Sequence, residues 1–335
     1  MNKITIIGLG LTGNSIGMAL KKTGAGNILV AGFDPDNARE QFALRKYMSV
    51  DEIAPNLESA VRGAQLVVLA TPMAAAGEVL AAIAPFLEDG ATVTDTLALK
   101  EPVMAEAGKV LGNGVSFVGG HPFSLTVDLD VADDNTAPDP DIFRGAPWCI
   151  MPLRGARNEA LNTVINLAEA LGGKPLFIDP VEHDSFLAAV SQLPVVASAA
   201  FLKTVAGSPA WIDMSGLAHG RFRSVSEGVA AQPELLASSL VDNRALLVRW
   251  VDQYMAALYD LRTLLANGNE EELGKILAET HAARLDWITP DSDGMDDARL
   301  RADLNQAISD SRPTQALMGS YLTERLFRKK ERGSR

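Results

Sequence analysis

The sequence predicts an α/β fold in which a doubly wound parallel sheet comes first and an all-α domain follows. Over residues 1–180, short apolar and β-branched runs alternate with helical stretches. A glycine-rich turn follows the first of these runs, and strand signals stop beyond Asp179. Strands that alternate with helices form parallel sheets, whose ligands lie at the carboxyl ends of the strands. The first half is therefore expected to be a Rossmann-type domain.

The first twenty residues organise this domain. Residues 4–7 are β-branched, as in a fully buried parallel strand, and the pattern G-x-G-x-x-G follows at Gly8, Gly10 and Gly13. The first glycine permits a sharp turn, the second lets a pyrophosphate approach the backbone, and the third lets the helix lie close to the sheet. The helix start at Leu11 and Thr12 then offers free N–H groups to phosphates.

An acidic residue ends the second predicted strand. Residues 28–33 are apolar, and Asp34 follows them about twenty residues after Gly13. A carboxylate at this place accepts hydrogen bonds from the ribose hydroxyls and repels a 2′-phosphate. The pattern therefore favours NAD as the cofactor. NADP is the less favoured alternative, because Arg39 lies nearby, and an ordinary βαβ unit with a solvated Asp34 is the alternative to any cofactor.

The same alternation of strand and helix continues to residue 180. The expected helices are 37–45, 73–86 and 158–171, and the expected strands are 64–70, 91–95, 115–118, 148–152 and 175–178. Thr71 and Pro72 end the strand 64–70 and are predicted to border the cofactor. The acidic segment 126–140 is expected to be a loop, which either covers the site or is a plain surface excursion.

Long helices are expected past residue 180. They span 182–205, 233–267 and 270–285, and their broad apolar faces suggest packing against a second subunit. We therefore predict a homodimer. The predicted domains are 1–180, which binds NAD, 181–290, which is helical and binds substrate, and a charged extension 291–335. Helices are expected in that extension near 298–308 and 318–329.

Composition narrows the possible partners. The chain has 335 residues and a formal net charge of −12, which disfavours nucleic acid and anionic membranes. The single cysteine, Cys149, excludes an internal disulfide and lies in an apolar run, so it is expected to be buried core. No signal peptide is expected, because the chain begins with a core strand. No membrane span is expected, because the apolar stretch 188–205 is interrupted by polar residues. No metal site is expected, because the four histidines are scattered. These features predict a cytoplasmic protein that acts on a small molecule.

One histidine has a distinctive setting. His121 follows the predicted strand 115–118 and stands between a diglycine and a proline. An imidazole at the carboxyl edge of the sheet can remove a hydroxyl proton as hydride leaves the same carbon. The alternative is a histidine that is satisfied within a turn.

Several motifs together resemble the prephenate/arogenate dehydrogenase (TyrA) family. They are the glycine turn, the Asp34 strand, GGHP at 119–122, DIFRGAPW at 141–148, DPVEHD at 179–184 followed by AAVSQLP, and SPAWIDMSGLA at 208–218. The resemblance covers about the first 290 residues. It implies an NAD(P) domain, a helical dimerisation domain and a site between them. It also implies oxidation of a ring C4 hydroxyl by NAD with loss of the ring carboxylate, and His121 matches the family's catalytic histidine.

The chain departs from the family at four places. One is the segment after GGHP, where FSLT at 123–126 replaces the common M-A-G-S type, and the other three are single positions. Ala98 stands where a serine commonly assists the histidine, Gln192 stands where VSHLP has its histidine, and Glu227 replaces an arginine that binds a substrate carboxylate. A glutamate would repel a carboxylate, so Arg223, or the nearby Arg221, is expected to substitute.

These departures set the candidate substrate residues and leave the substrate open. The candidates are Ser124, Gln192, Arg223 and Glu227, whereas His183 in the EHD motif is expected to be structural. An acidic pocket suits arogenate, which carries an amino group, better than prephenate. A divergent NAD(P)-dependent dehydrogenase or reductase for a different small molecule, cationic or lacking the carboxylate, is one alternative. A non-catalytic NAD-binding paralogue is another.

Overall fold

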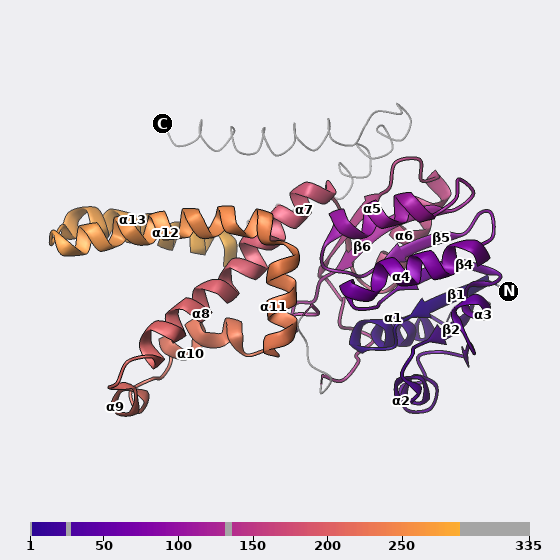
Figure 1. Cartoon of the computed structure of the whole chain (residues 1–335), viewed down its shortest axis with the longest axis horizontal. Coiled ribbons are helices and arrows are strands. Elements are labelled where there is room, and N and C mark those ends of the chain that lie inside the picture. Colours follow the sequence, from indigo (N-terminus) through magenta and orange to yellow (C-terminus); the bar gives the residue numbers. More distant parts are fainter. Residues whose placement is uncertain (1, 25–27, 131–135, 289–335) are drawn as a thin grey trace. The chain divides into compact units, whose positions relative to one another are not determined.

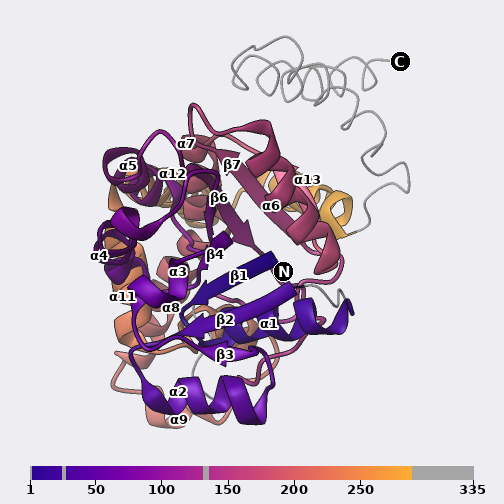
Figure 2. The same cartoon turned by 90° about the vertical axis from the view of Figure 1, so that its right-hand side faces the viewer.

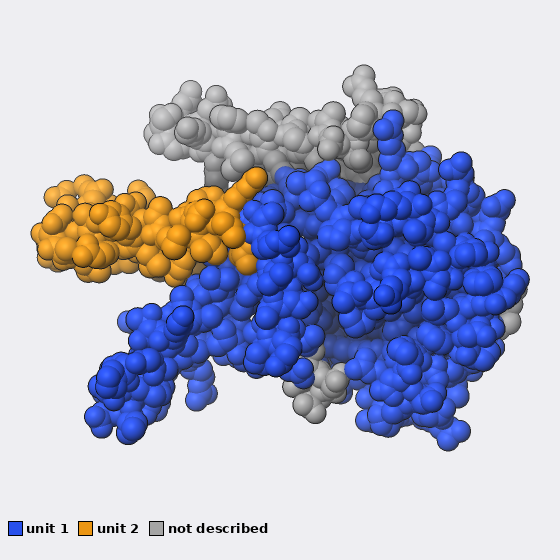
Figure 3. Space-filling model, viewed as in Figure 1, with its two compact units in different colours: residues 1–246 blue, residues 247–335 orange. Residues whose placement is uncertain are grey.

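A computed structural model describes residues 2–24, 28–130 and 136–288 of the chain. The chain divides into two compact units, residues 1–246 and 247–335 (Figure 3). The first unit holds the sheet, its covering helices and the first helices that follow. The predicted boundary at residue 180 stays a prediction, since this division falls inside a later helix.

The first unit is built on one mixed sheet, which has eight strands within the described residues (Figure 2). The order is β3-β2-β1-β4-β5-β6-β7-β8, so the chain reverses direction across the sheet between β1 and β4. In open α/β sheets, ligands bind where such a reversal occurs. The strands are β1 (Asn2–Ile7), β2 (Ile28–Phe33), β3 (Glu52–Ile53), β4 (Ala64–Leu69), β5 (Thr92–Asp95), β6 (Ser116–Pro122), β7 (Pro147–Pro152) and β8 (Lys174–Phe177).

The strand β6 is longer than the sequence predicts. It runs through the GGHP motif because β7 pairs with it in the antiparallel sense, with His121 opposite Cys149 and Gly120 opposite Ile150. All other pairs in the described sheet are parallel. His121 therefore lies inside a strand and not after one, which corrects the expected boundary at residue 118.

Helices cover both faces of the sheet. Figure 2 shows α4 and α5 on one side and α1 and α6 on the other. Side chains alternate between the faces: Ile7, Val67 and Leu69 pack in a core with Leu80 of α4 and Val103 of α5. These helices are α1 (Leu11–Lys22), α2 (Asn37–Gln41) with a π turn Phe42–Lys46, α3 (Leu57–Val61), α4 (Met73–Ile83) with a 3-10 turn Ala84–Phe86, α5 (Lys100–Val110) and α6 (Asn158–Ala170). The strand β3 and the helices α3 and α5 were not predicted from the sequence.

The rest of the described chain is helical, as predicted, but more divided (Figure 1). The expected helix 182–205 contains a π turn just before Pro194, whose ring removes a backbone donor. The expected helix 233–267 is interrupted at Asn243. The elements are α7 (Pro180–Leu187), the π turn Ala188–Gln192, α8 (Leu193–Ala206), α9 (Trp211–Ser215), α10 (Arg221–Ser226), the 3-10 turn Glu227–Val229, α11 (Pro233–Asp242), α12 (Arg244–Ala266) and α13 (Glu270–Ile288). The helices expected near 298–308 and 318–329 lie outside the described residues.

One helical run in the described chain, Pro180–Ala206, is long and apolar enough to cross a membrane by length and composition alone. The run nevertheless uses its polar groups within the protein. Gln192 bonds to α11 and Asp184 bonds to the start of α5. This is the pattern of a helix that packs against other protein elements.

Candidate active site

The glycine turn after β1 is shaped for a phosphate group. Gly8 has φ +98°, and a Cβ there would lie 2.3 Å from the carbonyl oxygen of Ala70. A Cβ on Gly13 would lie 1.9 Å from the oxygen of Gly8, whereas a Cβ on Gly10 would meet nothing closer than 3.8 Å, the distance to Arg39 Nη1. The turn is thus packed on its inner side and open at Gly10, as a close approach of pyrophosphate requires.

The start of α1 faces the same turn. The helix begins at Leu11 and Thr12, has no side-chain cap, and carries no acidic residue in its first turn. Its first N–H groups are therefore available to an anion, and the helix dipole favours negative charge there. Thr71 and Pro72 follow β4 directly beside Gly8, since the backbone nitrogen of Thr71 lies 3.0 Å from a Cβ placed on that glycine. The structure brings these predicted cofactor residues together, and the contact with cofactor stays a prediction.

Asp34 ties the end of β2 to the glycine turn. Its carboxylate accepts hydrogen bonds from the backbone N–H of Leu9 at 2.8 Å and of Asp36 at 2.9 Å. The side chain is buried in this single chain, and each oxygen keeps a second lone pair for a ribose hydroxyl. Arg39 lies over Gly10 and 3.9 Å from Asp36. The donor and acceptor set fits an adenosine ribose without a 2′-phosphate.

His121 stands at the same carboxyl edge of the sheet, on a backbone fixed by a buried ion pair. Gly120, the residue before it, donates its N–H to Asp95 Oδ1 at 3.0 Å and accepts from Lys100 Nζ at 2.7 Å through its carbonyl oxygen. Lys100 and Asp95 form an ion pair whose side chains are both 0% exposed. Any side chain at Gly120 would clash, because a Cβ would lie 2.6 Å from the carbonyl oxygen of Asp95. The imidazole therefore projects from a rigid strand.

A second histidine supports the first. His183 Nε2 lies 2.9 Å from His121 Nδ1, and His183 Nδ1 lies 2.9 Å from Asp184 Oδ1. Asp184 also accepts from the backbone N–H groups of Lys100 and Glu101 at the start of α5, at 2.9 Å each. Burial lowers the pKa of His183 despite its bond to Asp184, so its ring is neutral at pH 7. His183 thus contacts the candidate base directly.

The other ring nitrogen of His121 meets a loop carboxylate. Asp130 Oδ1 lies 3.2 Å from His121 Nε2. Burial alone raises the pKa of Asp130, but the adjacent His121 outweighs it and the net shift is downward. Burial, together with the charge of Asp130, raises the pKa of Asp128. The described part of the expected loop 126–140 therefore reaches the candidate base, and its role as a cover for the site stays a prediction.

Two of the predicted substrate residues bond elsewhere. Gln192 donates to the carbonyl oxygen of Ser239 at 2.9 Å and accepts from Asn243 Nδ2 at 2.8 Å, so its amide joins the π turn to α11. Ser124 Oγ lies 3.1 Å from Thr126 Oγ1 at the start of the loop. Substrate binding by either residue is a prediction that these contacts leave untested.

The other two predicted substrate residues lie on the protein surface. Arg223 belongs to α10 and Glu227 to the 3-10 turn after it, and both are exposed. Among the described residues, no hydrogen bond or ion pair connects either of them to His121. Ala98 lies half-buried between β5 and α5 and offers no polar group to the site.

Five functional candidates were missed from the sequence: Asp95, Lys100, Asp130, His183 in its contacting role, and Asp184. The DTLALK and EHD motifs contained four of them. Their partners lie far apart in the chain, His121 and His183 being separated by 62 positions, so local spacing could not pair them.

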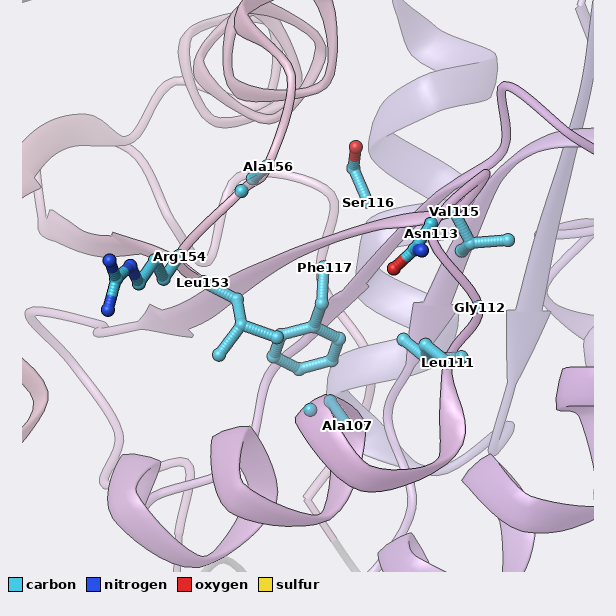
Figure 4. A pocket seen from close by; sticks show the side chains of 12 residues that line it. Ala107, Leu111, Gly112, Asn113, Val115, Ser116, Phe117, Leu153, Arg154 and Ala156 are labelled. Carbon is cyan, nitrogen blue, oxygen red and sulfur yellow. The ribbon is translucent and has the colours of Figure 1, made fainter. Parts of the chain in front are cut away.

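A hollow of about 340 Å³ lies elsewhere on the sheet (Figure 4). Ser116 and Phe117 at the start of β6, Leu153 and Arg154 after β7, and the end of α5 line it. It is at the amino end of β6, whereas His121 is near the carboxyl end of that strand. The hollow is therefore separate from the candidate active site.

A cradle for pyrophosphate and a buried imidazole at one edge of the sheet are the two parts that a nicotinamide-dependent dehydrogenase needs, and the fold and site define this class. Comparison with known proteins identifies the family within this class. Residues 16–176 match the prephenate dehydrogenase nucleotide-binding domain, and residues 179–279 match the prephenate dehydrogenase dimerization domain. The chain belongs to the prephenate/arogenate dehydrogenase family and is an NAD-dependent oxidoreductase.

Individual relatives agree with this family. A cyclohexadienyl dehydrogenase from Zymomonas mobilis is 29% identical over 287 residues, which cover 84% of this chain and 94% of the relative. The crystal structure of Synechocystis arogenate dehydrogenase is similar with a TM-score of 0.73 and 28% identity, covering 85% of this chain and 99% of that one. The fold is also that of Aquifex aeolicus prephenate dehydrogenase, solved with hydroxyphenyl propionate and NAD+, at a TM-score of 0.74 and 23% identity over 85% of this chain and 98% of that one.

Proposed function

We propose that this protein oxidises a cyclohexadienol of the prephenate or arogenate type with NAD, at the ring carbon that bears the hydroxyl, with loss of the ring carboxylate. The observation that carries the proposal is His121, a buried imidazole at the edge of the sheet that also holds the glycine cradle. When bound, NAD supplies the hydride acceptor. Aromatisation of the ring drives the reaction, so the protein mainly has to orient the substrate and take one proton.

Each part of the site has a role in this reaction. The turn around Gly10 and the first N–H groups of α1 would hold the pyrophosphate, and Asp34 would hold the ribose. His121 Nε2 would receive the proton of the ring hydroxyl. The Lys100–Asp95 pair keeps the strand before His121 in place through both backbone groups of Gly120.

An acidic group beside His121 and another at a family substrate position favour arogenate over prephenate. Glu227 stands where the family commonly has a carboxylate-binding arginine, and the loop carboxylate of Asp130 lies 3.2 Å from His121 Nε2. Acidic side chains attract the ammonium group of arogenate, whereas prephenate has an uncharged keto group in its place. Replacement of Glu227 by arginine should therefore increase turnover of prephenate relative to arogenate.

The test is formation of NADH, followed by its absorbance, when NAD is mixed with either arogenate or prephenate. We expect turnover that His121→Gln lowers by about 10²-fold or more, the usual contribution of a general base. His281→Gln is the matched control, because His281 is an exposed histidine on α13 and belongs to none of the candidate site residues. Binding of NAD without NADH formation from either substrate would refute the proposed reaction.

We also propose that the protein is a cytoplasmic homodimer. The match to a dimerization domain supports the dimer, as do large apolar side chains exposed in this single chain: Val241, Val248, Met255, Leu258, Leu265 and Trp287. Light scattering after size exclusion should give twice the chain mass of 35.6 kDa. A single-chain mass at micromolar concentration would contradict the dimer.

A further inference from the structure

We propose that His183 and Asp184 are positioning residues that fix the tautomer of His121, so that Nε2 is the basic nitrogen. This inference rests on the proposed function, because it assigns His121 the role of base. It adds which nitrogen of the His121 ring accepts the proton and which contacts make that nitrogen the acceptor. The supporting observations are the contacts of the two α7 side chains.

The chemistry of Asp184 determines which atom donates and which accepts in the hydrogen bonds from Asp184 through His183 to His121. Asp184 Oδ1 accepts only, so His183 Nδ1 must carry a proton and donate to it. A neutral His183 then has a lone pair on Nε2, which accepts from Nδ1–H of His121 at 2.9 Å. Nδ1 of His121 is thereby protonated in both charge states of the ring. Nε2 is left as the nitrogen that gains or loses a proton.

The surroundings keep His183 neutral. His183 and His121 are both buried, at 3% and 1% exposure, and a second cation beside a protonated His121 would be costly. The charged and titratable groups facing the two rings are Asp184 on α7, Lys100 on α5 with its partner Asp95 on β5, Asp128 and Asp130 from the loop, and Cys149 opposite His121 on β7. Lys100 disfavours a further positive charge, which reinforces the neutral state of His183.

Asp184 itself is held firmly. Its Oδ2 accepts from the backbone N–H groups of Lys100 and Glu101, and its carbonyl oxygen accepts from Asn243 Nδ2 at 2.9 Å. The acceptor that orients His183 is thus fixed to the start of α5 and to the end of α11. In this chain Ala98 supplies no hydroxyl to His121, so this support falls to α7.

The contact with Asp130 fits the same scheme. When its carboxylate accepts from His121 Nε2, both ring nitrogens carry protons and the ring is a cation. The ring hydroxyl of a substrate must take the place of Asp130 before Nε2 can accept a proton. His183 keeps the same tautomer in both situations.

Asp184→Asn is the decisive substitution. The backbone N–H of Glu101 requires an acceptor at the Oδ2 position, and the N–H of Lys100, which the two oxygens share at 2.9 and 3.1 Å, can also donate there. The amide nitrogen of the new side chain would therefore face His183 Nδ1. The proton order would then reverse, and His121 Nε2 would become an N–H group in the neutral ring. The matched control is Glu182→Gln, the same change from acid to amide two positions earlier on α7.

Two measurements on the full chain test the inference. In ¹H–¹⁵N spectra of the imidazole rings, Nδ1 of His121 should stay of the protonated type while Nε2 titrates, and Asp184→Asn should reverse this assignment. With substrate, Asp184→Asn and His183→Leu should each lower kcat by about 100-fold at unchanged KM for NAD. His183→Gln keeps an acceptor for His121 Nδ1 and should be about 10-fold faster than His183→Leu.

The outcomes separate this inference from the proposed function. A wild-type protein that turns over neither substrate refutes the function, while the ring spectra still decide the tautomer. The inference is overturned if Asp184→Asn leaves the ¹⁵N assignment unchanged, or if His183→Leu and His183→Gln lose activity equally. If Asp184→Asn does not fold, the comparison of the two His183 variants decides.

Discussion

Lys100→Met should unfold the first unit at a much lower denaturant concentration. Lys100 and Asp95 are both fully buried, so the substitution leaves a buried carboxylate without its counter-charge and the carbonyl oxygen of Gly120 without its donor. Removal of one partner from a buried ion pair costs about 3–5 kcal/mol. With a urea dependence of about 2 kcal/mol per molar, the midpoint should fall by about 2 M.

The assay is equilibrium unfolding in urea, followed by far-UV circular dichroism and by tryptophan fluorescence. Trp148 is fully buried next to Gly120 and reports on the sheet. The matched control is Lys109→Met on the same helix, whose side chain is 65% exposed and pairs with Glu106. Surface pairs of this kind contribute little, so its free energy of unfolding should stay within about 0.5 kcal/mol of the wild type.

A double substitution sharpens the test. Asp95→Asn combined with Lys100→Met removes the unpaired charge, and it should recover part of the stability that Lys100→Met loses. An unchanged urea midpoint for Lys100→Met, or equal losses for Lys100→Met and Lys109→Met, would refute the view that this pair holds the strand before His121.

Three further changes have defined outcomes. Gly8→Ala should weaken NAD binding at least about 10-fold by calorimetry, because a Cβ there would lie 2.3 Å from a carbonyl oxygen, whereas Gly90→Ala, with a similar φ of +97° and open space around it, should leave binding unchanged. Burial raises the pKa of Cys149 to about 12, so the native protein should not react with a thiol reagent at pH 8 until it unfolds, and rapid native labelling would contradict this. His121 helps to hold the pKa of the Asp130 carboxyl below its ordinary value, so His121→Gln should move the titration of Asp130, followed by ¹³C NMR, to higher pH; no movement would show that the contact is absent in solution.

The sequence was most informative where structure depends on local chemistry. The glycine spacing and Asp34 predicted the turn after β1 and the residue that anchors it, because sterics and strand ends act over a few residues. Prediction from the sequence failed where contacts between distant segments determine the structure. The pairing of β7 extended β6 through His121, and a side chain from α7 reached that histidine. Gln192 takes the place of a family histidine, yet its bonds go to α11, which its neighbours in sequence did not indicate.

The position of His121 within a paired strand has a consequence for how such enzymes diversify. The imidazole is held by main-chain ladder bonds of its strand, while Arg223 and Glu227 lie on a short helix and turn at the surface. With Glu227 in its proposed role of substrate selection, substitutions in this segment would alter which molecule is accepted without disturbing the group that handles the proton. Molecular choice and acid–base chemistry can therefore evolve at separate rates in one polypeptide.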